Sequence, residues 1–447
     1  MLTTTAIDRA ALVDWYRRNR GRSRALFDMI DPSAYYTRPI SLRNPIVFYE
    51  GHLPAFSVLA FLRRGLGQPS IDAALEKLFE RGIDPDSEAA AVPRSGASTI
   101  WPSRDAVLAF ARACDEAMFE AIATFAPTPQ AIEGLYTALE HEAMHQETLL
   151  YMFHRLPYDS KPGGGSRLAH GGRPAFGPSR PPHAARPVAG ASVVVPAGLA
   201  VLGADRSQVT FGWDNEFDAH EVQVPSFEVD VLPVTNAEFA AFIDAGGYRN
   251  RDLWDEEGWA WVQTERASHP AFWIPASATS ESPTSHVHPP HARWSWRGMF
   301  SAAPLPADSP VYVSQSEAAA YARWKGRRLM TEAEWHRAAE GATAGHADFA
   351  GYDPIAVGSH PETASVHGVH DLIGNGWEWT ATVFGPFTGF TPMASYPEYS
   401  ADFFDGRHYV MKGASPATAR ELIRPSFRNW FRGNYPYVYA KFRTVRR

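Results

Sequence analysis

Residues 128–156, TPQAIEGLYTALEHEAMHQETLLYMFHRL, decide how the N-terminal part of this chain folds. Apolar residues recur there at helical spacing, and Thr128 followed by Pro129 is a favourable start for a helix. His141 and His145 lie four residues apart, which places them one turn apart and about 40° apart on one helix face. Two imidazoles in this arrangement can reach one metal ion.

The spacing does not identify the ion, because imidazole nitrogen binds Zn, Fe, Cu and Ni alike. The two histidines are equally compatible with a structural or solvent-facing role. Three glutamates on the same turns favour a metal site, because carboxylates can orient the ring N–H groups of ligand histidines: Glu140, Glu142 and Glu147.

The same residues match the H-E-x-x-H pattern of zinc peptidases, in which the glutamate, here Glu142, acts as general base. A third ligand is missing nearby, because His154 lies nine residues beyond His145 and therefore on the opposite helix face. His52 in FYEGHLPAF, expected at the start of an apolar helix, is a better candidate. Three converging imidazoles would leave coordination positions open for substrates.

The rest of the N-terminal part also has helical periodicity. Ser103 is a suitable N-cap for one of the longer segments. The segments predict an all-α helical bundle, and they cover residues 7–30, 52–65, 70–81, 103–125 and 129–155.

Beyond the bundle the composition changes. Residues 158–190 are dense in Pro, Gly and Ser and predict a linker. Short β-like runs follow at 191–203 and 220–234, and the helices expected among them cover 235–247, 314–326 and 331–341. We therefore predict two domains: a bundle over 1–157 and an irregular α+β domain over 191–447, which holds 12 of the 14 tryptophans.

Composition narrows the function classes. A formal charge of −7 gives no general attraction for nucleic acid. The single cysteine, Cys114, excludes an internal disulfide or a cysteine-cluster metal site and fits a reducing cytoplasm. No export signal or membrane span is visible, so we expect a cytoplasmic protein with neither nucleic acid nor a membrane as partner.

The segments FYEGHLPAF and ALEHEAMHQETLLYM resemble the DinB-like helical domain of the non-haem iron sulfoxide synthases of ergothioneine and ovothiol biosynthesis. The second half resembles the formylglycine-generating-enzyme-like domain of the same synthases, which has a C-type-lectin-like fold. The matching segments there include VPAGLAVLGA, GNGWEWT and RPSFRNW. The resemblance covers most of the chain and implies a multidomain protein, an all-α bundle joined to an α+β domain.

The resemblance assigns an Fe(2+) site to His52, His141 and His145. It implies an oxygenase that uses dioxygen to join a thiol to C2 of the imidazole of hercynine, with the sulfur oxidised to a sulfoxide. Formylglycine generation itself is not expected, because that chemistry needs a cysteine pair and no cysteine follows Cys114. A non-enzymatic ligand-binding protein that keeps both folds is the remaining alternative.

The family resemblance also implies a substrate pocket lined by the segment FRNW, Phe427 to Trp430, which includes Arg428. Asn429 and Trp430 are expected to face the histidine substrate, since aromatic rings suit a quaternary ammonium. Trp377 and Trp379 belong to a motif that recurs in this fold whatever its function, so we expect them mainly in the framework.

Several positions depart from the family pattern. Phe431 stands where synthases that use γ-glutamylcysteine have an acidic residue, and their paired-arginine stretch is absent. Arg94, Arg104 and Arg432 are the candidate carboxylate clamps. We therefore expect cysteine as donor in preference to γ-glutamylcysteine, with a selenium donor or a free-histidine acceptor as alternatives.

Two further roles follow from the resemblance. Met144 stands where some members have a glutamine that touches the substrate, so recognition there must differ. The synthases use a tyrosine near the iron to deliver a proton or an electron. Tyr396 and Tyr399 are the preferred candidates for this catalytic role, and others occur at Tyr435, Tyr437 and Tyr439.

Overall fold

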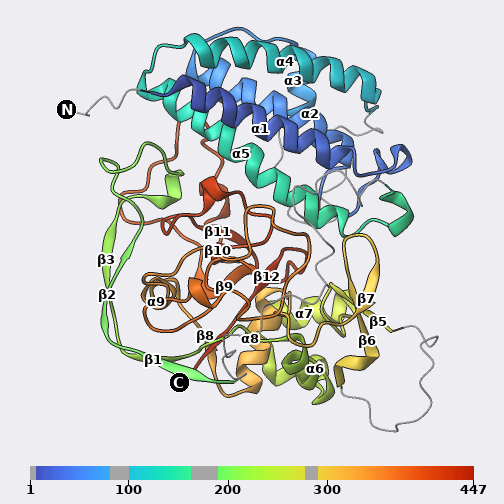
Figure 1. Cartoon of the computed structure of the whole chain (residues 1–447), viewed down its shortest axis with the longest axis vertical. Helices are drawn as coiled ribbons and strands as arrows, with labels where there is room; N and C mark the ends of the chain where they lie inside the picture. Colours follow the sequence, from blue (N-terminus) through green and yellow to red (C-terminus); the bar gives the residue numbers. More distant parts are fainter. Residues whose placement is uncertain (1–6, 81–99, 163–189, 277–289, 447) are drawn as a thin grey trace. The chain divides into compact units, whose positions relative to one another are not determined.

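The computed structural model describes residues 7–80, 100–162, 190–276 and 290–446, and it divides into two compact units (Figure 1). Unit 1 comprises Met1–His170, Arg206–Asp214 and Thr391–Tyr399, and unit 2 comprises the rest of the chain. Two short segments that follow the predicted linker therefore belong to the helical unit. Most of the predicted linker lies outside the described residues, and the domain boundaries stay a prediction.

Unit 1 is helical, as the periodicity predicts. Thr128 caps α5 by accepting from the Ala131 N–H, and Ser103 caps α4 by accepting from the Ala106 N–H. The helices are α1 (Arg9–Phe27), α2 (Ile46–Ser57), η2 (Val58–Gly65), α3 (Ala73–Phe79), α4 (Arg104–Thr124) and α5 (Pro129–Phe153).

The helix that carries His52 differs from the prediction. It begins at Ile46, so His52 lies in its second turn rather than at its start. Every residue of α2 is buried, and the helix continues directly into η2, a π-helix. The tight packing of α5 against η2 depends on Gly134, where an added Cβ would lie 2.3 Å from the Ala60 carbonyl oxygen.

The described residues of unit 2 form four sheets. The strands lie in the orders β1-β4-β13-β8, β11-β10-β9-β12, β2-β3 and β5-β6-β7. Their bounds are β1 (Ser192–Val195), β2 (Gly198–Leu202), β3 (His220–Val224), β4 (Phe227–Asp230), β5 (Trp273–Pro275), β6 (Trp294–Arg297), β7 (Ala302–Pro304), β8 (Arg328–Leu329), β9 (Gly376–Val383), β10 (His408–Ala414), β11 (Asn429–Arg432), β12 (Ala440–Lys441) and β13 (Thr444–Val445).

Four α-helices accompany these sheets. Three were predicted, and each begins with a capping box, as at Ser314 and Glu317 of α8. The fourth, α7, was missed because EEGWAWVQTE has little apolar periodicity. The helices are α6 (Asn236–Asp244), α7 (Glu256–Glu265), α8 (Gln315–Trp324) and α9 (Glu332–Ala338).

The sheet β11-β10-β9-β12 carries the FRNW segment. β11 pairs antiparallel with β10, with Asn429 opposite Met411 and Arg432 opposite His408 (Figure 1). Trp377 and Trp379 on β9 are buried in the core of unit 2. Among the described residues, none of the helices has the length and apolar character that a membrane span requires.

Candidate metal centre

Three histidines from two helices of unit 1 converge. His52 on α2 and His141 and His145 on α5 each offer one ring nitrogen, and these atoms all lie within 4.8 Å of one another. The Nε2 atoms of His141 and His145 are 3.1 Å apart. The four-residue spacing on α5 produces this pair, and the packing of α2 against α5 adds the third ring.

The tautomer of His52 follows from its hydrogen bond. Its Nδ1 lies 2.7 Å from the Phe79 carbonyl oxygen, which can only accept, so Nδ1 carries the proton. Its Nε2 therefore presents a lone pair, and this buried atom has no hydrogen-bond partner among the described residues. The end of α3 thus orients the ring for coordination.

All three rings are neutral at physiological pH. Burial lowers the pKa of His52 to about 4. Burial also moves the pKa of His141 and of His145 well below the ordinary histidine value, and the neighbouring histidines lower both further. Neutral imidazole is the protonation state that binds metals.

These residues fit a metal ion. Among the described residues the His52 Nε2 has no partner, and the Nε2 atoms of His141 and His145 have only each other, so a buried ion would satisfy lone pairs that the protein leaves largely unused. The Nδ1 atoms of His141 and His145 are also buried without hydrogen-bond partners among the described residues. An all-imidazole ligand set suits Fe, Zn, Cu or Ni and leaves positions open for other ligands.

Aromatic rings surround the histidines. Phe56 stacks on His141 with ring centroids 3.5 Å apart, and Phe48 stacks on His52 at 4.9 Å. The ring of Tyr396, from the segment Thr391–Tyr399, lies 6.0 Å from that of His141. These contacts limit the rotation of the imidazoles and place one of the two predicted catalytic tyrosines beside the site.

Glu142 does not face the metal centre. Its Oε1 accepts hydrogen bonds from Ser23 Oγ at 2.6 Å and from Arg20 Nη1 at 2.9 Å, and the side chain is buried against α1. A general base for hydrolysis must reach a water on the metal. The predicted zinc hydrolase alternative therefore lacks its base.

The glutamates do not orient the ligand rings either, contrary to the sequence-based expectation. Glu140 accepts from the indole N–H of Trp213 at 2.8 Å, and Glu142 binds Arg20. The Nδ1 atoms of His141 and His145 have no partner among the described residues, which also leaves Glu147 out of that role. His154 is buried beyond the C-terminal end of α5 and is not among the clustered ligands.

Met144 and Tyr399 contact each other in unit 1. The Tyr399 hydroxyl lies 3.4 Å from the Met144 sulfur, and the Tyr399 ring stacks on Trp213 at 3.9 Å. The ring centroids of Tyr399 and Tyr396 are 5.6 Å apart, and Tyr396 is the one whose ring contacts His141. A catalytic role for either tyrosine and a substrate-binding role for Met144 stay predictions.

Arg104 is paired within the protein. Its guanidinium binds the Glu50 carboxylate through Nε and Nη2, at 3.1 and 2.9 Å, and Asp28 lies 3.4 Å away. The hydrogen bond to Glu50 raises the pKa of Arg104. The Glu50 carboxylate occupies the position that a substrate carboxylate would need. Arg94 lies outside the described residues.

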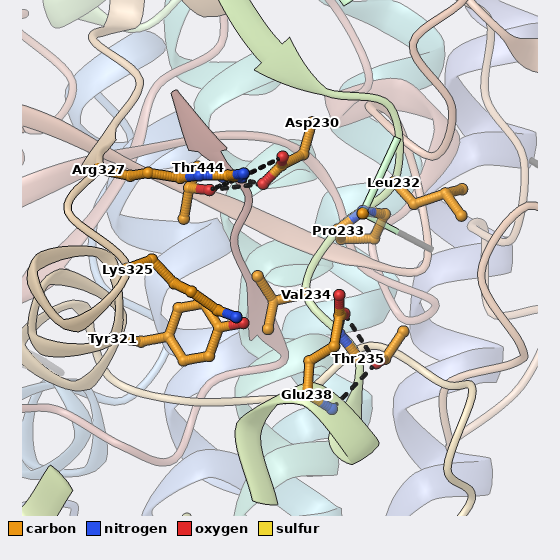
Figure 2. A pocket seen from close by; sticks show the side chains of 11 residues that line it. Asp230, Leu232, Pro233, Val234, Thr235, Glu238, Tyr321, Lys325, Arg327 and Thr444 are labelled. Atoms are coloured by element: carbon orange, nitrogen blue, oxygen red, sulfur yellow. Dashed lines mark hydrogen bonds and ion pairs between the residues drawn. The ribbon is translucent and has the colours of Figure 1, made fainter. Parts of the chain in front are cut away.

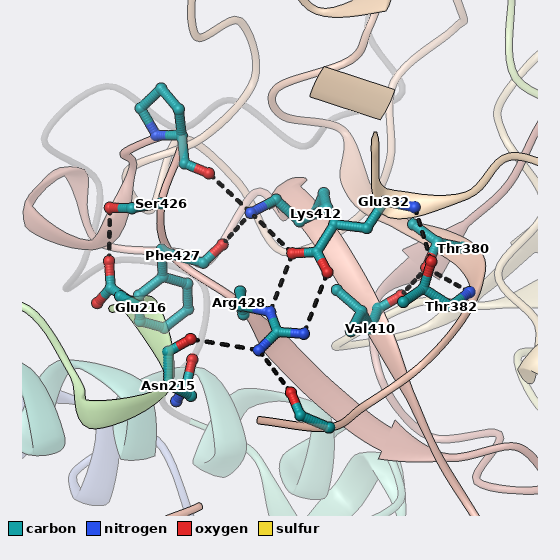
Figure 3. Close-up of polar contacts among 12 residues, drawn as sticks. Asn215, Glu216, Glu332, Thr380, Thr382, Val410, Lys412, Ser426, Phe427 and Arg428 are labelled. Atoms are coloured by element: carbon teal, nitrogen blue, oxygen red, sulfur yellow. Dashed lines mark hydrogen bonds and ion pairs between the residues drawn. The ribbon is translucent and has the colours of Figure 1, made fainter. Parts of the chain in front are cut away.

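Arg428 is held in the core of unit 2 (Figure 3). It pairs with both oxygens of Glu332 at 3.0 and 3.1 Å, and it donates to the carbonyl oxygens of Asn215 and Gly385. Its guanidinium also lies over the ring of Phe387, 4.1 Å from the centroid. These contacts engage the Arg428 guanidinium within unit 2, and a substrate-binding role for Arg428 stays a prediction.

The residues that follow Arg428 are half-buried on β11. Asn429 and Trp430 are consecutive in a strand, so their side chains leave it on opposite faces. Trp430 stacks on Phe384 at 4.2 Å, and Phe431 stacks on Tyr435 at 5.0 Å. Substrate binding by Asn429, Trp430, Phe431 and Arg432 stays a prediction.

Other aromatic candidates belong to the framework of unit 2. Trp379 is buried and donates to the Val313 carbonyl oxygen, and Trp377 packs near Phe427. Tyr439 is buried beside Tyr312. The expectation of a packing role for the two tryptophans agrees with these contacts.

A pocket in unit 2 offers no competing site (Figure 2). Its volume is about 70 Å³, well below the roughly 300 Å³ of ordinary ligand sites. Several of its polar side chains bind other residues of unit 2: Arg327 and Thr444 donate to Asp230, and Glu238 completes the capping box of α6.

Residues missed by the sequence analysis belong to the surroundings of the histidines. Phe56, the Phe79 carbonyl and Trp213 all contact the site residues, but none carries a sequence signal of its own. The spacing of Phe56 from His52, four residues along an apolar helix, is the one hint that both lie on one face.

Comparisons with known proteins agree in both halves of the chain. Residues 16–149 match the DinB superfamily, and residues 178–447 match the sulfatase-modifying factor enzyme 1-like domain. The chain is 33% identical over 414 residues to the hercynine oxygenase of Mycolicibacterium thermoresistibile, covering 87% of this chain and 84% of that protein.

Two further relatives extend over nearly the whole chain. The hercynine oxygenase of Mycolicibacterium smegmatis is 33% identical, over 95% of this chain and 96% of its own length. Ergothioneine biosynthesis protein 1 of Neurospora crassa is 28% identical over 94% of this chain, which matches 55% of that longer protein.

Proposed function

Because the chain belongs to the hercynine oxygenase family, we propose that it is an iron(II)- and dioxygen-dependent sulfoxide synthase of ergothioneine biosynthesis. Its substrates are hercynine, a thiol and O2, and it acts in the cytoplasm without nucleic acid or membrane. The observation that carries the proposal is the cluster of neutral His52, His141 and His145 side chains in unit 1.

The overall reaction balances with dioxygen as the only oxidant. The C2–H bond of the hercynine imidazole and the S–H bond of the thiol break, and one C–S bond forms. One oxygen atom is transferred to sulfur as the sulfoxide, and the other leaves with the two hydrogens as water. A ferrous ion bound by the three histidines would supply open coordination positions and the one-electron chemistry that dioxygen activation requires.

The chain's own residues prepare this site. The Phe79 carbonyl fixes the His52 tautomer, and Phe56 fixes the plane of His141. Tyr396 lies near enough to His141 to exchange a proton or an electron with reactants there. We propose cysteine as the preferred donor, with Asn429 and Trp430 in recognition of hercynine.

A direct assay tests the activity. Protein loaded anaerobically with Fe(II) should bind one equivalent, and its oxygen uptake should become fast and match sulfoxide formation only when hercynine and a thiol are both present. His141→Ala should lose the metal, while His360→Ala, which changes a partly exposed histidine in unit 2, should keep it. Bound zinc with no oxygen uptake for any thiol would overturn the proposal.

A competition assay tests the substrates. Cysteine, γ-glutamylcysteine and a selenosugar are offered together, against hercynine and against histidine, and the products are identified by mass. We expect the cysteine sulfoxide of hercynine to dominate. A selenium product or a histidine product would replace the assigned substrates within the same chemistry.

A further inference from the structure

A row of aromatic rings leads away from the histidine cluster inside unit 1. Tyr396 lies 6.0 Å from His141 between ring centroids, Tyr399 lies 5.6 Å from Tyr396, and Trp213 lies 3.9 Å from Tyr399. The Tyr399 and Trp213 rings are nearly parallel, with 30° between their planes. Trp213 is fully buried.

The row continues to a half-buried side chain on α1. Phe211 lies 5.6 Å from Trp213 and stacks on Tyr136 of α5 at 5.7 Å, and Trp15 lies 5.8 Å from Tyr136. Trp15 is only half-buried. The contacts thus form an unbroken series from a metal ligand to a tryptophan that solvent can reach.

The composition of this row suits electron transfer. Tyrosine and tryptophan are the side chains that lose one electron most easily, and all members of the row are of these types except Phe211. Phe211 is a packed bridge between Trp213 and Tyr136. A second series starts at His145, where Tyr49 lies 5.6 Å away, followed by Phe48 at 5.3 Å and Trp101 at 6.2 Å. It contains one tyrosine and no buried tryptophan, so we expect the row through Trp213 to carry more of the charge.

The surroundings of Trp213 favour a positive charge on its ring. Its indole N–H donates to the Glu140 carboxyl group at 2.8 Å, and both side chains are buried. An acceptor oxygen at this distance stabilises an oxidised indole strongly in a medium of low dielectric constant. Glu140 is one helical turn from Tyr136, a later member of the row. The Trp213 indole therefore binds the same face of α5 that carries Tyr136.

We propose that Trp213 and Trp15 form a one-electron exit for oxidising equivalents that arise from dioxygen at the histidine site and do not react with substrate. The inference rests on the proposed oxygenase function. Such a path would protect the ligand histidines from oxidation during unproductive encounters with O2.

One electron passes from Trp213, through the rings of Tyr399 and Tyr396, to the oxidant at the site, which is reduced by one electron. The Trp213 indole becomes a radical cation and keeps its N–H on Glu140. Trp15 then returns one electron to Trp213, and a soluble thiol or ascorbate-type reductant restores Trp15 and releases its own proton to solvent.

Mass mapping of oxidised residues tests the exit. The full chain, loaded with Fe(II), is exposed to O2 without hercynine and with catalase to remove dissolved peroxide, and oxidised side chains are located in its peptides. We expect oxidation of Trp15 in the unaltered chain. Trp213→Phe should lower it severalfold and raise oxidation of Tyr396, Met144 and the ligand histidines.

Two further variants keep the test decisive. Phe211→Leu interrupts the row while Trp213 and its hydrogen bond remain, and it should also lower Trp15 oxidation severalfold. Trp261→Phe, which changes a half-buried tryptophan of unit 2 outside the row, is the control and should leave the pattern unchanged. Unchanged Trp15 oxidation in both Trp213→Phe and Phe211→Leu would overturn the inference.

The failure of the proposed function gives a different result. Each protein is assayed in parallel for sulfoxide formation with both substrates present. If the unaltered chain makes the sulfoxide, and Trp15 is oxidised equally in it and in Trp213→Phe, the protein has the activity and lacks the exit. A chain that neither binds iron nor consumes O2 lacks the oxygenase function itself.

Discussion

Glu142 is the residue whose role changes most between sequence and structure, and its substitution is informative. Glu142→Gln keeps the shape of the side chain but removes the charge that faces Arg20, at 2.9 Å in a buried site. We expect the free energy of unfolding to fall by about 1–3 kcal/mol, the usual contribution of a hydrogen bond to a charged group. Urea denaturation of the metal-free protein measures it.

The matching control is Glu120→Gln on the exposed face of α4, which should change stability by no more than about 0.5 kcal/mol. Glu142→Gln should still bind one Fe(II), because its side chain points toward α1. Loss of metal with unchanged stability would show that Glu142 acts at the metal centre after all.

For single residues, the sequence predicts which histidines cluster better than it predicts the side chains around them. The four-residue spacing of His141 and His145 determines that they share a face, whatever packs nearby. The partner of Glu142 depends instead on α1, which contacts α5 from more than a hundred residues away. The same holds for Trp213, whose hydrogen bond to Glu140 no local pattern predicts.

Among the elements, the contact of α5 with η2 gives the sharpest test. Gly134→Ala would normally stabilise a helix by up to about 1 kcal/mol. Here the added Cβ would meet the Ala60 carbonyl oxygen at 2.3 Å, and backbone cannot move aside cheaply. We therefore expect a net loss of about 1–3 kcal/mol in unfolding free energy, together with weaker Fe(II) binding because α5 and α2 carry the ligands.

Gly21→Ala is the paired control within unit 1. Gly21 is exposed on α1, and an added Cβ there meets nothing within 4 Å. This variant should gain about 0.5–1 kcal/mol in unfolding free energy and bind Fe(II) as before. Equal effects of the two alanines in chemical denaturation would contradict the packing argument.

The sheet that carries β11 contains a buried lysine, which makes the free energy of unfolding depend on pH. Lys412 on β10 donates to the carbonyl oxygens of Pro425 and Phe427, and burial lowers its pKa to about 8 (Figure 3). Between pH 8 and the unfolded value near 10.5, the unfolded chain binds more protons, so stability rises with pH. The gain relative to Lys412→Met should approach about 3 kcal/mol across this window.

The unfolding free energies of the wild type and of Lys412→Met, measured with denaturant from pH 7 to 10.5, test this expectation. Lys77→Met, at an exposed position of unit 1, provides the reference for a lysine that folding does not bury. A difference between wild type and Lys412→Met that stays flat or falls with rising pH would show that the ammonium is not desolvated.

Helices were predictable where an N-cap residue precedes a segment with apolar residues at helical spacing. Thr128 and Ser103 begin α5 and α4 as expected, and the capping boxes of unit 2 mark three of its four helices. The helix α7 was missed because its apolar residues are consecutive, from Trp259 to Val262, and do not recur at helical spacing. Residues 58–65 are helical as predicted, but the i→i+5 hydrogen bonds that make η2 a π-helix have no signal in the apolar pattern.

Over the whole molecule, the sequence predicted two architectures, and the family comparison confirms both. It did not predict that Arg206–Asp214 and Thr391–Tyr399 belong to the helical unit. These segments carry Trp213, Tyr396 and Tyr399, and Tyr396 contacts the His141 ring from more than 250 residues along the chain. Contacts at such sequence separations leave no periodic signal.

A metal ion held by the three histidines would couple the stability of α2 to that of α5, because the ligands come from both helices. A ligand that binds only the folded state stabilises it by RT ln(1 + [L]/Kd), about 2.7 kcal/mol at one hundred times Kd. Anaerobic Fe(II) should therefore raise the unfolding temperature of the transition in which unit 1 melts, measured by calorimetry. His52→Ala removes the only ligand from α2 and should abolish the shift, although His141 and His145 remain one turn apart on α5. A shift that survives His52→Ala would mean that the α5 pair binds the ion alone, and that α2 contributes packing rather than coordination.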